Sequence, residues 1–100
     1  AIGMIDLFDF NPQHQRAGIG ILVHKEYQKA GFASDALSLL ITYCFKTLNL
    51  HQIFANITPD NYQSIKLFTT NSFKKCGNKK DWLFTNGKYK DELIFQLIYE

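Results

Sequence analysis

The sequence predicts an α/β domain built on a mixed sheet, with helices on both faces of that sheet. A glycine-containing apolar run over residues 17–23 and an alternating segment over residues 52–58 flank a helical pattern over residues 32–48. This order of strand, helix and strand is typical of a parallel βαβ unit with a right-handed crossover. Further along, Asn86-Gly87 separates two alternating segments. That dipeptide favours a two-residue hairpin turn, because both positions accept positive φ.

The first two strands are expected to form an antiparallel hairpin. Residues 1–8 are dense in apolar side chains, which indicates a buried strand, and the polar turn 11–16 joins them to the strand over residues 17–23. Gly18 and Gly20 weaken this second strand. Glycines in such positions often mark a bulge or a place where another group lies against the backbone.

Two helices follow from the apolar spacing. The longer one, about residues 32–48, has its apolar residues at intervals of three and four, so they form one buried face. These residues are Ala33, Ala36, Leu37, Leu40, Cys44 and Leu48. The shorter helix begins after Pro59, with Asp60 or Asn61 as its N-cap.

A β-ribbon is expected after Phe73. One strand covers about residues 81–85 and another residues 88–90, and the last strand covers about residues 91–99. In the last strand apolar residues occupy both alternating sets, so we expect burial on both of its sides.

Composition limits the classes of protein to which the chain can belong. Its 100 residues are enough for one small core, so we expect a single domain over residues 1–100, and 46% hydrophobic residues exclude a disordered chain. The formal net charge is only +2. The lysine cluster over residues 74–80 is typical of a solvated surface, so nucleic-acid binding is a minor alternative. No apolar run approaches the roughly 20 residues of a membrane span.

Cysteines and histidines show no metal-ligand spacing. The chain has two cysteines, Cys44 and Cys76, and three scattered histidines, which form no pattern such as CxxC or HExxH. We therefore expect no metal site. Two thiols without a disulfide pattern fit a reducing compartment and favour a cytoplasmic location.

The stretch from Val23 to Ala36 has the pattern of an anion site. A strand leads into a loop containing Gly31, and the helix pattern begins directly afterwards. The free N–H groups and the dipole of a helix N-terminus favour a phosphate, and a glycine lets the backbone approach it closely. Gln28 and Lys29 offer side-chain donors. Spacing alone fits an ordinary turn before a helix equally well.

Two motifs together resemble the GNAT superfamily of acyl-CoA N-acyltransferases. Residues 28–33, Gln-Lys-Ala-Gly-Phe-Ala, resemble its Gln/Arg-x-x-Gly-x-Gly/Ala signature. Residues 61–68, followed by Asn71-Ser72-Phe73, are similar to its Asn-x-x-Ser/Ala-x-x-Leu-Tyr…Gly-Phe segment. Within the superfamily, the chain looks most like bacterial spermidine N-acetyltransferases and ribosomal-protein N-terminal acetyltransferases.

The resemblance implies transfer of an acetyl group from acetyl-CoA to a primary amine, by direct attack of the amine on the thioester. It also implies that the strand before the loop splays from its neighbour, and that a backbone amide near Leu22 or Val23 polarises the thioester carbonyl. Asn61 and Ser64 would contact the pantetheine or hold a catalytic water. The implied cofactor-binding residues are Leu22, Val23, Gln28, Lys29, Ala30, Gly31, Phe32, Ala33, Asn61, Ser64 and Phe68.

Three positions depart from the family pattern. Phe68 stands where many relatives carry a tyrosine that acts as general acid, and a phenyl ring has no proton to give. Gly18 stands where spermidine-type relatives often carry a glutamate, and Ser72 replaces a glycine. Tyr43, Tyr62 and Asp6 are the remaining candidates for acid or base by chemistry alone.

The resemblance also implies that an opening strand and two helices precede residue 1 in a complete member, so we expect the chain to be a fragment. Exposed strand edges would favour a homodimer. A non-catalytic CoA-binding or regulatory module is the alternative to an enzyme.

Overall fold

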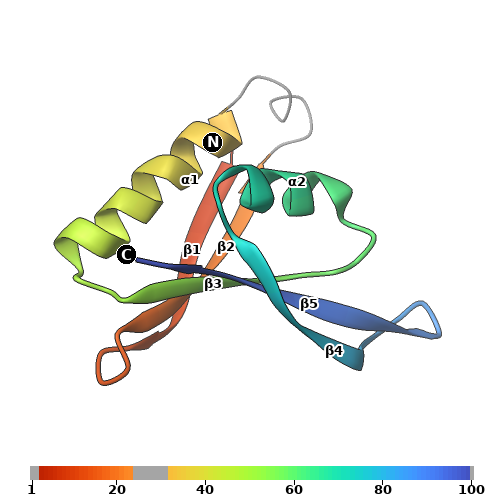
Figure 1. The fold of residues 1–100 in the computed structure, drawn as a ribbon. Helices are drawn as coiled ribbons and strands as arrows, with labels where there is room; N and C mark the ends of the chain where they lie inside the picture. The colour runs from red at the N-terminus through yellow and green to blue at the C-terminus, as the bar shows by residue number, and fades with distance from the viewer. Residues whose placement is uncertain (1–2, 24–31, 100) are drawn as a thin grey trace.

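The computed structural model describes residues 3–23 and 32–99 (Figure 1). A five-stranded mixed sheet, in the order β1-β2-β3-β5-β4, forms its centre. The elements in chain order are β1 (Gly3–Asn11), β2 (Arg16–Val23), α1 (Phe32–Thr42), the π-helix η2 (Tyr43–Thr47), β3 (Gln52–Ile57), α2 (Tyr62–Thr70), β4 (Lys74–Thr85) and β5 (Lys88–Ile98).

The strand pairing confirms most of the predicted topology. β1 and β2 form an antiparallel hairpin, and α1 connects β2 to the parallel strand β3. β4 and β5 form the second hairpin, in which Asn86 has a φ of 53° and Gly87 a φ of 75°. Both central residues of that turn therefore have the positive φ that a two-residue hairpin turn requires. The two strands expected over residues 88–90 and 91–99 are one strand, and β4 begins earlier than predicted, at Lys74.

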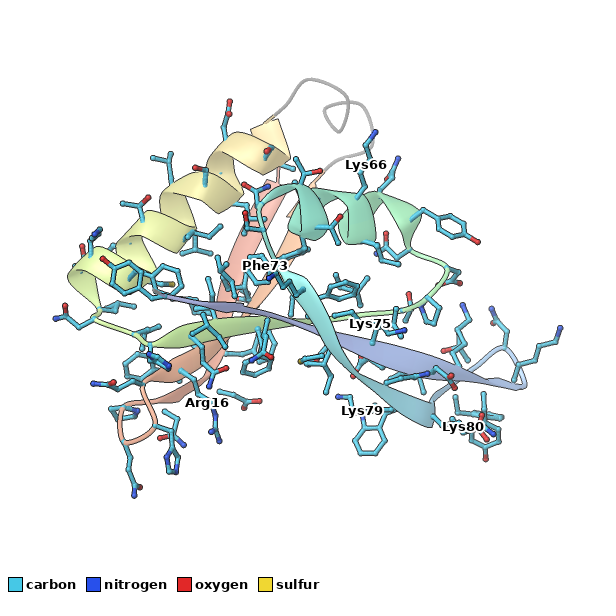
Figure 2. The ribbon with its side chains drawn as sticks, in the orientation of Figure 1. Arg16, Lys66, Phe73, Lys75, Lys79 and Lys80 are labelled. Atoms are coloured by element: carbon cyan, nitrogen blue, oxygen red, sulfur yellow. The ribbon has the colours of Figure 1, made fainter. Side chains whose placement is uncertain are left out.

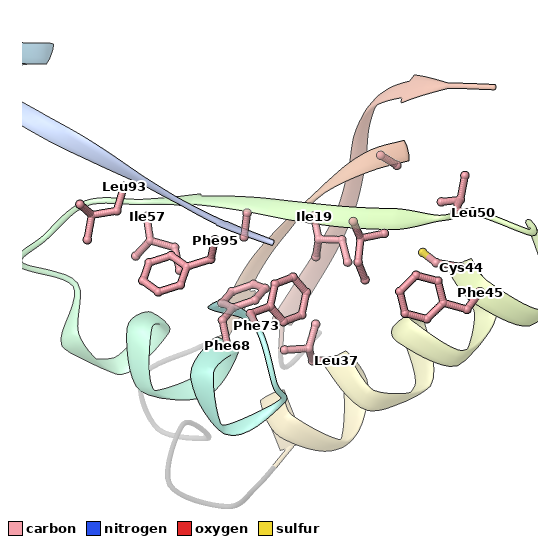
Figure 3. Close-up of a cluster of buried hydrophobic side chains, with 13 residues drawn as sticks. Ile19, Leu37, Cys44, Phe45, Leu50, Ile57, Phe68, Phe73, Leu93 and Phe95 are labelled. Atoms are coloured by element: carbon pink, nitrogen blue, oxygen red, sulfur yellow. The ribbon is translucent and has the colours of Figure 1, made fainter. Parts of the chain in front are cut away.

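Both α-helices pack on one face of the sheet, so the prediction of helices on both faces is wrong for the described residues. Figure 3 shows α1 and α2 side by side below the strands, with the buried side chains between them and the sheet. Leu37 of α1, Phe68 of α2 and Ile53 of β3 belong to the same cluster. The other face of the sheet is not covered by any described helix.

The long helix changes its geometry before it ends. An α-helix was expected over residues 32–48, but from Tyr43 the chain forms a π-helix, in which the Leu48 N–H donates to the Tyr43 carbonyl over 3.0 Å. The wider turn places two consecutive residues, Cys44 and Phe45, in the core. Cys44 and Phe45 continue the buried face of α1, since they follow Leu37 by seven and eight residues, which is the spacing of one helix face. Asn49, with a φ of 55°, terminates the helix.

Two burial predictions for the strands are wrong. β1 lies at an edge of the sheet, and its Leu7 and Phe10 side chains are 37% and 51% exposed. β5 buries Leu93 and Phe95 under the helices, but Ile98 on its other side is 44% exposed. Ile98 is exposed because no described helix covers the second face of the sheet. Leu7, whose partner Ile19 faces the helices, is exposed because β1 is the edge strand.

Candidate functional site

β2 and β3 pair only at the start of β2 and then diverge. The parallel ladder joins Arg16 to Gln52 and ends where Gly18 meets Phe54. β2 continues to Val23 and β3 to Ile57, and in Figure 1 β2 rises away from β3. Backbone N–H and C=O groups need hydrogen-bonding partners. Beyond Ile19, β3 supplies none to the edge of β2 that faces it, so the backbone of residues 20–23 is available to a ligand.

The predicted carbonyl-polarising positions lie in this unpaired stretch. Leu22 and Val23 are the last residues of β2, and their register partners on the other edge are Met4 and Gly3 of β1. They therefore lie beyond the end of the β2–β3 ladder. A backbone amide held between a paired strand and an open side is rigid, which is a requirement for stabilising charge in a transition state.

The helix of the predicted anion site begins where the sequence places it. α1 starts at Phe32, so its first turn contains both Phe32 and Ala33. Its N-terminus follows the C-terminal end of β2 after the connection 24–31, which is where anions bind in many α/β folds. Gln28, Lys29, Ala30 and Gly31 lie outside the described residues.

One contact that the sequence did not predict fixes this helix N-terminus. The Asn71 side-chain amide donates to Ser34 Oγ over 3.3 Å and to the Leu67 carbonyl over 2.9 Å. Asn71 follows α2, and Ser34 lies in the first turn of α1. The bond therefore joins the end of α2 to the beginning of α1. Its only signal in the sequence is the position of Asn71 just before Phe73, within the second motif.

The structure brings Asn61 and Ser64 together. Asn61 is the N-cap of α2, and its Oδ1 accepts a hydrogen bond from the Ser64 backbone N–H over 3.2 Å. Of the two predicted caps, Asn61 is therefore the correct one. Capping uses the Asn61 side-chain oxygen, while the Ser64 hydroxyl lies on a half-buried side chain at the first turn of the helix.

Asp60, the other predicted cap, forms an ion pair instead. Lys90 Nζ donates to Asp60 Oδ2 over 2.8 Å, which connects β5 to the residues before α2. The Lys90 hydrogen bond, with a smaller contribution from Thr58, lowers the pKa of the Asp60 carboxyl below its usual value. The pair thus stabilises the fold above the unfolded-state pKa of an aspartate, and this contribution is lost as the pH falls through the lowered pKa.

Phe68 is a core residue. Its side chain is 3% exposed, and its ring meets the Phe73 ring edge-on, with centroids 4.9 Å apart (Figure 3). The predicted contact of Phe68 with the cofactor stays a prediction, and in the described chain its ring packs among the protein's own side chains. We assign it a packing role.

The open face of the sheet carries aromatic side chains near the point of divergence. The Phe8 ring from β1 meets the Phe54 ring from β3 edge-on, with centroids 5.6 Å apart. Phe8 also lies over Gly18, where a Cβ atom would overlap its ring. The next glycine of β2, Gly20, lies opposite Asp6 of β1. Tyr43 and Tyr62, the other acid candidates, are 47% and 76% exposed.

Other kinds of site find little support in residues 3–23 and 32–99. No group of three or more His, Cys, Asp or Glu side chains there could hold a metal ion. None of the described helices has the length and hydropathy to cross a membrane. Cys44 and Cys76 are free thiols, and burial raises the pKa of Cys44, which makes it unreactive.

The basic residues that the structure describes do not form one continuous patch. In Figure 2, Arg16, Lys79 and Lys80 lie on the side of the sheet away from the helices, whereas Lys66 projects from α2 on the opposite side. Lys79 is also paired with Glu92, over 2.8 Å. This distribution favours a solvated surface over a nucleic-acid interface.

Comparison with known proteins identifies the family. The family model described as "Acetyltransferase (GNAT) domain" matches residues 1–74. The chain belongs to the GNAT acetyltransferase family. The resemblance of the two sequence motifs is thereby confirmed.

Several GNAT relatives are similar over most of the chain. Spermidine N(1)-acetyltransferase of Vibrio cholerae is 31% identical over 90 residues, which are 90% of this chain and 52% of the relative. The [ribosomal protein uS5]-alanine N-acetyltransferase of Escherichia coli K12 is 32% identical over 79 residues, 79% of this chain and 41% of the relative. The chain spans about half the length of the curated relatives it matches.

Solved GNAT structures have the same fold. A crystal structure of a probable acetyltransferase superposes with a TM-score of 0.92 at 29% identity, covering 97% of this chain and 55% of that one. A variant of the spermidine N-acetyltransferase SpeG from Vibrio cholerae also gives a TM-score of 0.92 at 29% identity, covering 97% and 57%. The GNAT fold predicted from the motifs is therefore confirmed.

The backbone conformation at position 72 explains why the GNAT motif has a glycine there. Ser72, which replaces the family's glycine before Phe73, has a φ of 74°. This left-handed conformation is one that glycine adopts freely and that costs an L-residue with a side chain about 1 kcal/mol or more. The turn has kept its shape here with a strained serine, and Phe73 still enters the core.

Proposed function

We propose that the protein is an acetyl-CoA-dependent N-acetyltransferase that acts on a primary amine, such as a polyamine, a protein N-terminus or a small-molecule amine. The observation that carries this proposal is the divergence of β2 and β3 after Gly18, directly before an α-helix N-terminus. Relatives named as spermidine and ribosomal-protein alanine N-acetyltransferases support the type of reaction and the nature of the acceptor.

The structure offers acetyl-CoA two kinds of contact. The β3-facing backbone edge of residues 20–23 would pair with the amides of the pantetheine arm, as a neighbouring strand would. The N-terminus of α1, with Phe32 and Ala33 in its first turn, and the loop residues 28–31 would hold the pyrophosphate, where backbone N–H groups and the helix dipole favour an anion.

The reaction would be a direct transfer. The neutral amine forms a bond to the thioester carbonyl carbon, and the C–S bond breaks with its electron pair remaining on sulfur. A fixed backbone N–H near Leu22 or Val23 would stabilise the negative charge that develops on the carbonyl oxygen. Holding the two reactants in place supplies much of the remaining acceleration.

The leaving thiolate needs a proton, and Phe68 cannot provide one. We propose that a water held near Ser64 and Asn61 serves instead. The Asn61 oxygen is engaged with the Ser64 N–H, so the Ser64 hydroxyl and the Asn61 side-chain amide are the groups left for that water. Since a thiolate is a good leaving group, protonation by water is sufficient.

The alternative of a non-catalytic CoA-binding module is less well supported. It was suggested by the loss of the acid at Phe68 and of the carboxylate at Gly18, but matching relatives are named as N-acetyltransferases.

We also propose a cytoplasmic location, which the free thiols of Cys44 and Cys76 support. Homodimer formation through the edge strands β1 or β4 stays a prediction.

The test is acetyl transfer by the protein at its natural length. It is incubated with acetyl-CoA and, separately, with spermidine or a peptide that begins with alanine, and the acetylated acceptor is detected by mass spectrometry. We expect turnover of at least one acceptor. Binding of acetyl-CoA without turnover of any primary amine would favour the non-catalytic module.

A further inference from the structure

On the open face of the sheet, β2 carries glycine at two successive positions near the divergence. Ala17 and Ile19 of β2 are buried under the helices, so the residues between and after them, Gly18 and Gly20, face the opposite side of the sheet. At these two positions β2 itself offers no side chain to an acceptor that approaches from this face. Any side chain that contacts it there has to come from a neighbouring strand.

β1 provides those side chains. Phe8 pairs with Gly18 and Asp6 pairs with Gly20. The Phe8 ring occupies the space that a side chain at position 18 would need, which leaves no room there for a carboxylate. At Gly20 the space is open, and Asp6 Cβ would lie 3.9 Å from an added Cβ atom. Asp6 thus lies over Gly20, on the same face as Phe8.

Asp6 is also close to the proposed reaction centre. Gly20 precedes Leu22 by two residues, which corresponds to about 7 Å along a strand. The Asp6 side chain is exposed, so a solute can reach its carboxylate. Asp9, the other acidic residue of β1, lies beyond Phe8 at the irregular end of the ladder and farther from Leu22.

We propose that Asp6 binds the amine of the acetyl acceptor, in place of the carboxylate that position 18 cannot accommodate. This inference rests on the proposed function. At neutral pH a primary amine arrives as an ammonium ion, which the carboxylate attracts and holds by a charge-assisted hydrogen bond. The ring of Phe8 packs against the carbon chain next to the amine.

Asp6 binds and orients the amine, and it does not accept either proton that the amine nitrogen loses. The ammonium ion gives one proton to water, and the nitrogen lone pair then forms the C–N bond as the C–S bond breaks. The second proton of the nitrogen passes through water to the thiolate, which leaves as the thiol. The carboxylate holds the ammonium ion and takes no proton from it, so its removal should affect the KM of the acceptor more than kcat.

The experiment compares Asp6→Asn with Asp9→Asn, the same change on the same strand at another exposed aspartate. Initial rates are measured with spermidine and with an alanine-starting peptide, and acetyl-CoA binding by calorimetry. We expect Asp6→Asn to raise the acceptor KM about tenfold, with acetyl-CoA affinity unchanged and Asp9→Asn close to wild type. Asp6→Glu should recover part of the loss.

The salt dependence gives a second readout that a purely structural residue would not change. In the wild type the acceptor KM should rise with ionic strength, and Asp6→Asn should flatten this dependence. An acceptor KM in Asp6→Asn equal to that of Asp9→Asn, or an equal loss of acetyl-CoA binding and acceptor binding, would overturn the role of Asp6 while leaving the proposed function intact. A wild-type protein without any transferase activity would overturn both.

Discussion

The two faces of the sheet differ in how deeply their side chains are buried, although the same strands contribute to both. Along β3, Ile53, Ala55 and Ile57 are at most 4% exposed and pack under α1 and α2. The residues between them, Phe54 and Asn56, are half-buried on the face that the described helices leave open. On β2 the contrast is stronger, because the covered face has Ile19 in the core and the open face has Gly18 and Gly20 on either side of it.

The covered face therefore carries the residues that stabilise the fold, and the open face carries the residues proposed to take part in the reaction. The covered face holds every residue of the buried hydrophobic cluster that the described part of the chain contains. The open face presents backbone and a few side chains from β1 near the place where β2 leaves β3. Substitutions on the covered face should therefore change the free energy of unfolding, whereas Asp6 on the open face should change catalysis with little effect on folding.

The largest expected effect comes from the covered face. Leu37 in α1 is fully buried, and Leu37→Ala should lower the free energy of unfolding by about 2–5 kcal/mol, because it leaves a cavity. Leu39, two residues along the same helix, is 73% exposed. Leu39→Ala should therefore change stability by less than about 0.5 kcal/mol. Urea denaturation of the two variants measures this difference, and equal losses would contradict the assignment of the covered face.

A smaller effect is expected where Phe8 lies over Gly18. Gly18→Ala forces the ring off its place beside Phe54 and should cost about 1–3 kcal/mol. Gly20→Ala, two residues further on in β2, meets only an ordinary contact at 3.9 Å and should be close to neutral.

A double-mutant cycle sharpens this result. Phe8→Ala removes the obstructing ring, so Gly18→Ala should cost less in the Phe8→Ala background than in the wild type. Additive effects of the two substitutions would show that the ring does not occupy the space above Gly18.

The smallest effect concerns the turn between the covered helix α2 and β4. Ser72 has a φ of 74°, so Ser72→Gly should raise the free energy of unfolding by about 1 kcal/mol. Ser38→Gly within α1 is the matched change at a helical position and should lower it by about 0.5–1 kcal/mol. Thermal unfolding of both variants shows whether each substitution raises or lowers the free energy of unfolding. A destabilised Ser72→Gly variant would contradict the account of this turn.

Sequence patterns were sufficient for elements whose signal is local. The Asn86-Gly87 turn and the Asn61 cap each depend on a few neighbouring residues, and both lie as predicted. The parallel β2–β3 pairing followed from the length of the helical connection. Family motifs identified the GNAT fold, because they report long-range geometry that local patterns lack.

Features that depend on tertiary packing were not predictable. Apolar periodicity does not say which face of the sheet a helix covers, so α2 could not be assigned to the same face as α1. The π-helix from Tyr43 has no signature in the apolar spacing, because its buried residues Cys44 and Phe45 also fit the buried face of an α-helix. In the site, the contact of Asn71 with Ser34 and the place of Phe8 over Gly18 join residues that the sequence separates.

The most direct test of the central claim is a calorimetric titration of the protein with acetyl-CoA, repeated with Gly31→Val and with Gly77→Val. The second substitution is the control, since Gly77 lies in β4, where an added Cβ meets Ile94 at an ordinary 3.5 Å. The account predicts saturable binding by the wild type and by Gly77→Val, and loss of binding in Gly31→Val. Equal binding by all three proteins, or none by a folded wild type, would contradict an acetyl-CoA site between β2 and α1.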